Sequence, residues 1–211
     1  MFQLYNNIFV ILMLEFIDCI HNTQPSDYFS FEFLNNPLFK ILPEGYDICY
    51  MIKRTNDYLG GYFYLYDSTQ PMNIYNSDYV LGVVEFYIDL EEDELNIPIL
   101  KTNSDLDGFD MTRGGIGTYL LLCAIAYAKS FDIFTAKLED MSDKYRTPNN
   151  IYEKLGFVYE EEDSGPEMIG LVNDIYNKID DFIMSRGERF VSKLNSLTEY
   201  FDDEEWEMDL E

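Results

Sequence analysis

The sequence has little of the chemistry that holds metals or disulfide frameworks. It contains one histidine, His21, and three cysteines, Cys19, Cys49 and Cys123, with no Cys-x-x-Cys pair. Structural zinc sites need four nitrogen or sulfur ligands, and disulfide-stapled domains need a dense, even set of cysteines. The sequence therefore predicts no metal site, no disulfide framework, and reduced buried thiols in an intracellular, cytoplasmic protein.

Positive charge is equally scarce. Lys and Arg number 14 against 40 Asp plus Glu, which gives a formal net charge of -26. No basic stripe is present to neutralise phosphates, so nucleic-acid binding is excluded, and an anionic membrane surface is repelled as well. The same field attracts cations. The acidic surface therefore serves solubility alone, or it favours a basic substrate or partner.

Apolar runs long enough to span a bilayer are also missing. The N-terminal run at residues 8–14 is seven residues long and is followed at once by Glu15 and Asp18, so we expect a buried N-terminal helix or strand. Alanine is rare (four residues) beside 18 Tyr and 16 Phe. That bias is typical of AT-rich genomes such as those of many large DNA viruses, and it leaves open an association with a virion.

The apolar residues that are present predict one folded domain with an α/β (α+β) mixed central sheet flanked by helices. Residues 79–90 alternate at the period of a strand, and Glu85 interrupts an otherwise apolar second face. Residues 95–102 follow as a strand, in which Pro98 predicts an edge or splayed position. A polar loop, a buried helix over residues 113–129 and a strand over residues 133–138 come next.

Helical patterns continue to the C-terminus. Thr147 and Pro148 are typical of a helix start, and Gly156 of a helix end. Residues 172–201 predict one or two extra amphipathic helices, bent near Gly187, and residues 202–211 form an acidic tail. These helices either pack on the sheet or, with the tail, dock a protein partner.

A glycine-rich turn before the buried helix is the sharpest local motif. Glycines let a ligand approach the backbone, and the positive end of the helix favours a phosphate or pyrophosphate. Neither the spacing of a dinucleotide-binding turn nor the Gly-Lys-Ser/Thr of a P-loop is present. Taken alone, the motif is equally compatible with an ordinary turn. The candidate binding residues are Arg113, Gly114, Gly115, Ile116, Gly117 and Thr118.

A second motif, Tyr-Glu-Lys-Leu-Gly-Phe, begins at Tyr152. By itself it is typical of a short helix with a packed tyrosine and a glycine cap. Together with the glycine turn, the long helix and the strand between them, it resembles the GNAT N-acetyltransferase superfamily. The resemblance covers residues 62–171 and is densest over residues 112–157. It implies a GNAT-like domain over residues 1–171, followed by the helical extension and the acidic tail.

The resemblance implies a cofactor and a mechanism. In the family, the pyrophosphate of acetyl-CoA lies on a turn of pattern Arg/Gln-x-x-Gly-x-Gly/Ala. The end of that pattern is matched from Gly115 to Gly117, while Thr112 stands at its first position. An amine attacks the thioester, main-chain N–H groups of the fourth strand hold the oxyanion, and Tyr152 protonates the departing thiolate. Glu85 is the candidate general base, or else a carboxylate at the margin of the sheet.

Two functions follow. The first is an acetyl-CoA-dependent N-acetyltransferase that acts by direct transfer on the primary amine of a basic acceptor, a polyamine or a Lys-containing peptide. The second is a catalytically inactive GNAT-derived structural or interaction protein, for example in a viral particle. We favour the enzyme because Gly115, Gly117 and Tyr152 are kept in register.

Overall fold

The computed structural model describes the backbone of residues 18–55, 58–69, 80–103, 105–106, 109–110, 114–141, 150–160 and 165–208. It describes the side chains of these residues except 105–106, 109–110 and 201–208. The N-terminal run at residues 8–14, the candidate Arg113, and the residues Thr112, Thr147 and Pro148 lie outside the described part.

The core of the fold is one mixed sheet with the strand order β1-β2-β3-β4-β5-β8-β10-β9. All neighbouring strands in it are antiparallel except β5 and β8, which are parallel. A separate two-stranded ladder is formed by β6 (Asp105–Leu106) and β7 (Phe109–Asp110). The strands of the large sheet are β1 (Asp18–Cys19), β2 (Tyr46–Arg54), β3 (Tyr58–Asp67), β4 (Val80–Asp89), β5 (Glu94–Thr102), β8 (Thr135–Glu139), β9 (Val158–Tyr159) and β10 (Glu167–Leu171).

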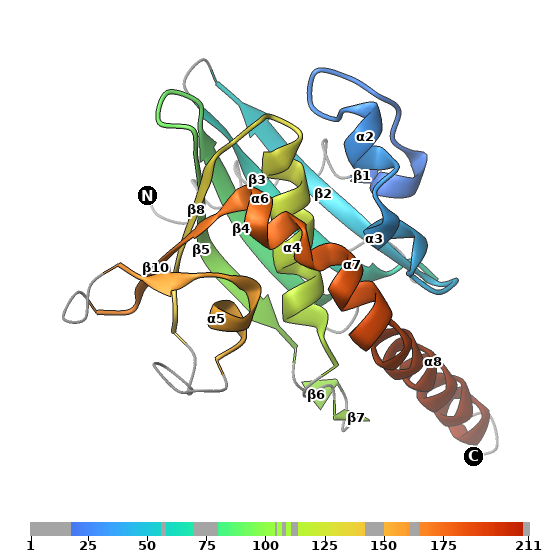
Figure 1. The fold of residues 1–211 in the computed structure, drawn as a ribbon. Helices are drawn as coiled ribbons and strands as arrows, with labels where there is room; N and C mark the ends of the chain where they lie inside the picture. Colours follow the sequence, from blue (N-terminus) through green and yellow to red (C-terminus); the bar gives the residue numbers. More distant parts are fainter. Residues whose placement is uncertain are drawn as a thin grey trace, which may run out of the picture.

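Helices flank this sheet, and the predicted α/β architecture is confirmed. Figure 1 shows α4 lying across the sheet, with α6 against it and with α7, α3 and α2 to its right. None of the described helices is long and apolar enough to cross a lipid bilayer. The helical elements are η1 (Ile20–Asn22), α2 (Phe31–Leu34), α3 (Pro37–Lys40), α4 (Ile116–Lys129), α5 (Ile151–Leu155), α6 (Val172–Tyr176), α7 (Lys178–Phe182), the π-helical segment η3 (Ile183–Gly187) and α8 (Glu188–Met208).

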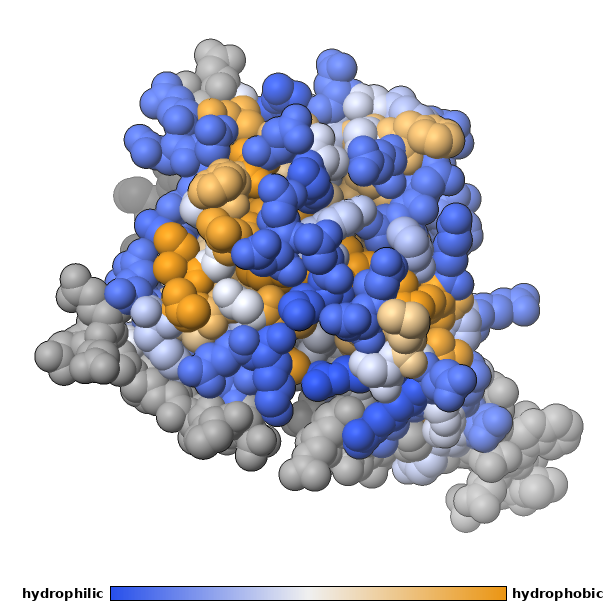
Figure 2. Space-filling view, in the orientation of Figure 1, coloured by the Kyte–Doolittle hydropathy of each residue, from blue (hydrophilic) through white to orange (hydrophobic). Residues whose placement is uncertain are grey.

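The outer surface of this helical face is mostly polar. Figure 2, in the orientation of Figure 1, shows hydrophilic residues over much of it. Apolar residues gather over the part of the sheet that carries β10 and α5. The mostly hydrophilic surface therefore still exposes apolar side chains beside β10 and α5.

Strand β4 shows how the alternating pattern produces this packing. Val84, Phe86 and Ile88 are buried beneath the helices, while Glu85 lies on the opposite face. A β-carbon on Gly82 would lie 2.9 Å from side-chain atoms of α4. The glycine therefore lets α4 approach the sheet closely.

Helix α4 is buried nearly all round, and Tyr127 is at the centre of its contacts. The ring of Tyr127 is fully buried and lies 5.1–5.5 Å from five phenylalanine rings. Its hydroxyl has no hydrogen-bond partner within the described part of the chain. The five rings are those of Phe29, Phe33, Phe63, Phe86 and Phe131.

The C-terminal helices pack on this core, as one of the two sequence alternatives predicted. Phe190 is 1% exposed and stacks on Tyr119 of α4 with a centroid distance of 4.7 Å. The hydroxyl of Tyr46 donates to the carbonyl of Leu194 at 2.9 Å. The predicted bend near Gly187 coincides with η3, and α8 continues through Met208.

Candidate functional site

Strands β5 and β8 diverge part of the way along their length. Their parallel pairing runs from Glu94 opposite Thr135 to Ile97 opposite Leu138 and then stops. Pro98 follows directly, and proline has no N–H to donate to a ladder. Strand β5 continues to Thr102 while pairing with β4. The splayed position predicted at Pro98 is confirmed, and the two strands form a fork.

The start of α4 lies against the end of β5. Gly115 caps the helix with a φ of 88°, a conformation that glycine adopts without strain. The first intrahelical bond runs from the N–H of Tyr119 to the carbonyl of Gly115, so the N–H groups before it have no acceptor within the helix. A β-carbon on Gly117 would lie 3.3 Å from the side-chain methyl of Thr102.

The structure brings five of the six candidate binding residues together here, and the sixth, Arg113, lies outside the described part. Gly115, Gly117 and Thr118 are partly accessible, whereas Gly114 and Ile116 are buried. Backbone N–H groups at a helix N-terminus are good donors to phosphate oxygens. The turn therefore offers main-chain donors of the kind that bind phosphate oxygens, although the net charge of -26 opposes a polyanion.

Tyr152 reaches the fork from α5. A pocket of about 280 Å³ lies there, lined by residues 97–100 of β5, residues 138–139 of β8, Met141 and Tyr152. Burial raises the pKa of the Tyr152 phenol, and the negative charge of Asp140 raises it further. The phenol is therefore neutral at physiological pH, which is the state that a proton donor needs.

A buried polar network, which the sequence did not reveal, holds α5 in place. The side-chain oxygen of Asn150 accepts the backbone N–H of Tyr152 at 2.7 Å, and its amide group donates to Asp140 and to the Tyr159 hydroxyl. That hydroxyl donates to Asp140 at 2.7 Å. Asp140 and Asn150 are 1% and 2% exposed, so the network is shielded from water and fixes the start of α5 to the end of β8.

The helix start predicted at Thr147 and Pro148 is wrong, because α5 begins at Ile151 with Asn150 as its cap. Asparagine is among the best N-cap residues. Asn150 was therefore the signal that could have located the helix start.

Glu85 lies on the face of the sheet opposite α4. It accepts a hydrogen bond from the Tyr62 hydroxyl at 2.9 Å. Burial first, and then this bond, raise the pKa of Tyr62 to about 12. Ile99 of β5, which lies opposite Glu85 of β4, lines the Tyr152 pocket, whereas Glu85 itself does not. The structure thus places Glu85 beside the fork without bringing it to Tyr152.

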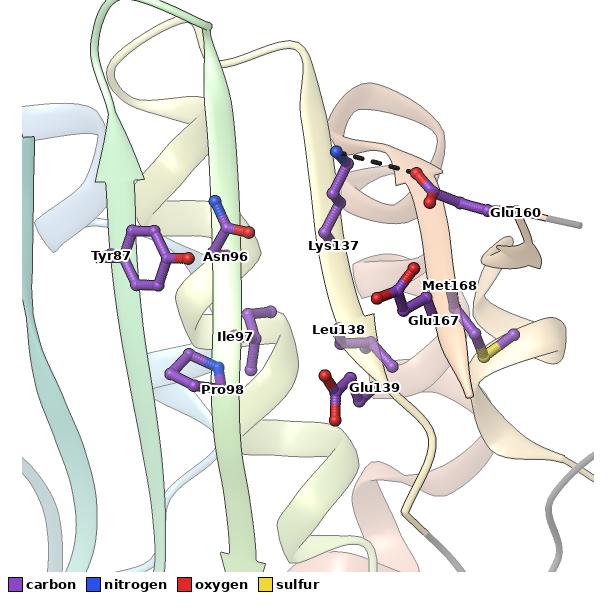
Figure 3. A pocket seen from close by; sticks show the side chains of 10 residues that line it. All are labelled: Tyr87, Asn96, Ile97, Pro98, Lys137, Leu138, Glu139, Glu160, Glu167 and Met168. Atoms are coloured by element: carbon purple, nitrogen blue, oxygen red, sulfur yellow. Dashed lines mark ion pairs between the residues drawn. The ribbon is translucent and has the colours of Figure 1, made fainter. Parts of the chain in front are cut away.

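A second pocket, of about 340 Å³, opens on the face of the sheet away from α4 (Figure 3). It shares Ile97, Pro98, Leu138 and Glu139 with the Tyr152 pocket, so the two meet at the fork. Its wall is completed by Tyr87, Asn96, Lys137, Glu160, Glu167 and Met168.

The second pocket is acidic. Its lining includes Glu139, Glu160 and Glu167 against the single cation Lys137. Figure 3 shows Lys137 directed toward Glu160, 3.7 Å away, and Lys137 also pairs with Glu94 at 2.8 Å. The hydrogen bond with Glu94 is the main cause that raises the pKa of Lys137. The remaining carboxylates, Glu139 and Glu167, lie opposite each other across β8 and β10, so the pocket favours a cationic group.

Within the described part of the chain, no group of three His, Cys, Asp or Glu side chains is placed to hold a metal ion. No protein-family model matches the sequence, and no curated protein does.

Solved structures with a similar arrangement include two acetyltransferases and the protein Ard1. Nourseothricin acetyltransferase is 13% identical, with 60% of this chain and 72% of that one covered and a TM-score of 0.38. The PaiA N-acetyltransferase of Thermoplasma acidophilum in complex with coenzyme A is 23% identical, with 53% and 57% covered and a TM-score of 0.33. Ard1 of Thermoplasma volcanium is 15% identical, with 64% and 74% covered and a TM-score of 0.35.

The order of elements in this chain is the one that the sequence motifs indicated. A glycine turn leads into a buried helix, a parallel strand follows, and a short helix ends in the second motif before the sheet is completed. The chain therefore has the mixed α/β sheet with flanking helices that its sequence predicted, and α6, α7 and α8 follow the last strand.

Proposed function

We propose that this chain is an acetyl-CoA-dependent N-acetyltransferase that acts by direct transfer on the primary amine of a basic acceptor, such as a polyamine or a Lys-containing peptide. One observation carries the proposal. The fork between β5 and β8 has the glycine turn of α4 beside it and Tyr152 inside it. The edge of β5 and Tyr152 thus line one pocket, and the glycine turn lies at the end of the same strand.

Backbone groups would hold the acyl donor. The N–H groups at the start of α4, from Gly115 to Thr118, would donate to the pyrophosphate, with Gly114 and Arg113 preceding them in the sequence. Strand β5 beyond Ile97 has no partner in β8, so its edge is free for the amides of the pantetheine arm. Bound there, acetyl-CoA supplies a thioester-activated acetyl group, and the β5 N–H groups are the donors that would stabilise negative charge on its carbonyl oxygen.

Tyr152 would deliver the proton. Its raised pKa keeps the phenol protonated, and the bond from its backbone N–H to Asn150 fixes the helix that carries it. Neutral tyrosine next to a departing thiolate is a suitable general acid, because the thiolate is protonated as it leaves.

The acceptor would enter through the acidic pocket. Its carboxylates, Glu139 and Glu167, attract an ammonium group toward the fork. Among candidates for the base, Glu139 is better placed than Glu85, because Glu139 lines both pockets. Such a role for the acidic pocket would explain why the chain is strongly acidic. Its negative charge opposes binding of the anionic acetyl-CoA but raises the local concentration of a cationic acceptor.

The test begins with thermal unfolding of the full chain with and without acetyl-CoA. Ligand at 100 times its dissociation constant stabilises by about 2.7 kcal/mol, which raises the midpoint by roughly 5–10 °C for a chain of this size. Release of coenzyme A thiol is then measured with spermidine and with a Lys-containing peptide. A chain that shows neither stabilisation nor release is not an acetyltransferase.

Two tyrosine variants locate the chemistry. Tyr152→Phe is expected to lower kcat by about 100-fold or more and to leave the acetyl-CoA stabilisation unchanged. Tyr58→Phe is the matched control, because Tyr58 is 44% exposed on β3 and lines neither pocket of the fork. Equal activity in the two variants would remove Tyr152 from the mechanism.

The alternative, a catalytically inactive GNAT-derived interaction protein, also has one observation in its favour. Phe182 and Phe190 lie 3.7–3.9 Å from where a β-carbon of Gly115 would be, so the C-terminal helices cover one side of the glycine turn. Such a protein would bind its partner through the C-terminal helices and acidic tail. If acetyl-CoA stabilised the chain but no amine tested caused release of coenzyme A, this alternative function would be supported.

A further inference from the structure

We propose that Cys19 and Cys49 are a reversible redox pair, joined to a disulfide by exchange with a low-molecular-weight disulfide and separated again by a small thiol. The two cysteines lie directly opposite each other on the antiparallel strands β1 and β2, with their sulfur atoms 3.0 Å apart. Opposite residues of such strands have Cα atoms about 4.5–5.5 Å apart. A disulfide needs about 4.4–6.8 Å, so the pair can close without moving the backbone.

The two thiols differ in accessibility. Cys19 is half-buried, whereas Cys49 is fully buried against Tyr64 and Tyr66 on the face of the sheet away from α4. The pKa of the Cys49 thiol is raised first by its hydrogen bond with Cys19 and then by burial. An external disulfide therefore meets Cys19, while Cys49 is held as the second, resolving thiol.

The exchange has two balanced steps. The Cys19 thiolate attacks one sulfur of the external disulfide, which forms a mixed disulfide on Cys19 and releases one small thiolate, which takes up the proton lost by Cys19. Cys49 then loses its proton and attacks the Cys19 sulfur, which forms the Cys19–Cys49 bond and releases the second small thiol. The pair loses two electrons, and the external disulfide gains them.

The Cys19–Cys49 disulfide would close the loop of residues 19–49, whose side chains line most of a separate cavity. A cavity of about 570 Å³ lies beside α2 and α3, and every residue that lines it except Ser68 falls between Cys19 and Cys49 in the sequence. His21 and Asp47, which are 3.1 Å apart, also lie in this loop. Within the described part of the chain, strand β1 pairs over two residues, and Thr23 contacts the Tyr50 hydroxyl beyond them. Oxidation would therefore add a covalent anchor at the entry to this loop, and reduction would leave the entry held by non-covalent contacts.

The experiment treats the folded full chain with cystamine, a cationic disulfide chosen because the chain is strongly acidic. The parent is expected to fall from three free thiols to one, to lose the mass of two hydrogens and to retain no cysteamine. Cys49→Ser is expected to retain one cysteamine on Cys19, because the resolving thiol is gone. Cys19→Ser is expected to keep both of its thiols, since Cys49 and Cys123 are fully buried.

A stability readout separates a cross-link from a mere adduct. Closing the loop from Cys19 to Cys49 is expected to raise the unfolding midpoint by about 5 °C or more, and a reducing thiol should reverse the rise. Cys49→Ser with its adduct should show no such rise. A parent chain that keeps three thiols, or that retains cysteamine on Cys19, would overturn the proposal.

Discussion

Replacing Tyr127 by phenylalanine is expected to stabilise the protein. The Tyr127 ring is surrounded by phenylalanine rings, and its hydroxyl is buried without a hydrogen-bond partner in the described part of the chain. Burial raises the pKa of this phenol far above its usual value, so the group is neutral at physiological pH. The cost that it imposes is therefore that of a desolvated, unpaired hydroxyl.

The magnitude follows from two opposing effects. An unpaired buried hydroxyl costs about 1–3 kcal/mol relative to its hydrated state in the unfolded chain. Removing one oxygen leaves a small void, which offsets a few tenths of a kcal/mol at about 24 cal/mol per Å³. Tyr127→Phe is thus expected to raise the free energy of unfolding by about 1–2 kcal/mol and the midpoint by roughly 2–6 °C.

The matched control is in the same helix. Tyr119 is equally buried, but its hydroxyl donates to the carbonyl of Leu38 at 3.2 Å. Tyr119→Phe is therefore expected to lose about 0.5–1.5 kcal/mol. Urea unfolding of both variants and the parent measures the two changes. Opposite signs support the reasoning, and a Tyr127→Phe chain destabilised as much as Tyr119→Phe refutes it.

Three further predictions concern packing and pH. Phe190→Ala is expected to lower the free energy of unfolding in urea by about 3–5 kcal/mol, because it removes the ring that joins α8 to α4. The control Met184→Ala should change little, because Met184 is 76% exposed. Equal effects of the two substitutions would contradict this packing. Gly82→Ala should cost about 1–3 kcal/mol, measured in the same way, since its β-carbon would meet Ile116 at 2.9 Å; a neutral result would contradict the close approach. Stability should fall as pH rises above about 8.5, because burial raises the pKa of the Cys123 thiol above its usual value and that of tyrosines such as Tyr62 to about 12, so the unfolded chain ionises first. Midpoints that stay level from pH 9 to 11 would contradict it.

Local patterns predicted the parts of the fold that depend on near neighbours. The alternation in β4, the buried stripe of α4 and the missing N–H of Pro98 each act within a few residues, so their consequences can be read without knowing the topology. The break near Gly187 was predictable for the same reason. The placement of the glycine turn beside β5 did not follow from a local pattern, because β6 and β7 lie between β5 and α4 in the sequence.

The rest of the candidate site depends on strand order. Glu139 and Glu167 meet because β10 pairs with β8, a pairing that the sequence does not specify. Asp140, Asn150 and Tyr159 converge for the same reason, with each residue unremarkable in its own segment. Glu85 could be assigned to the correct strand and face, but its distance from the fork depends on how far β5 separates from β8.

The packing of α7 and α8 over the glycine turn has a consequence for biosynthesis. Phe182 and Phe190, which contact Gly115 and Tyr119, follow every strand of the sheet in the sequence. A nascent chain therefore exposes the aromatic face of α4 until these residues have left the ribosome, and that face cannot be closed by any earlier segment in the described part of the chain. Premature termination between residues 171 and 182 would thus release a chain that contains every strand of the sheet but lacks the side chains that cover the glycine turn, a species suited to capture by chaperones.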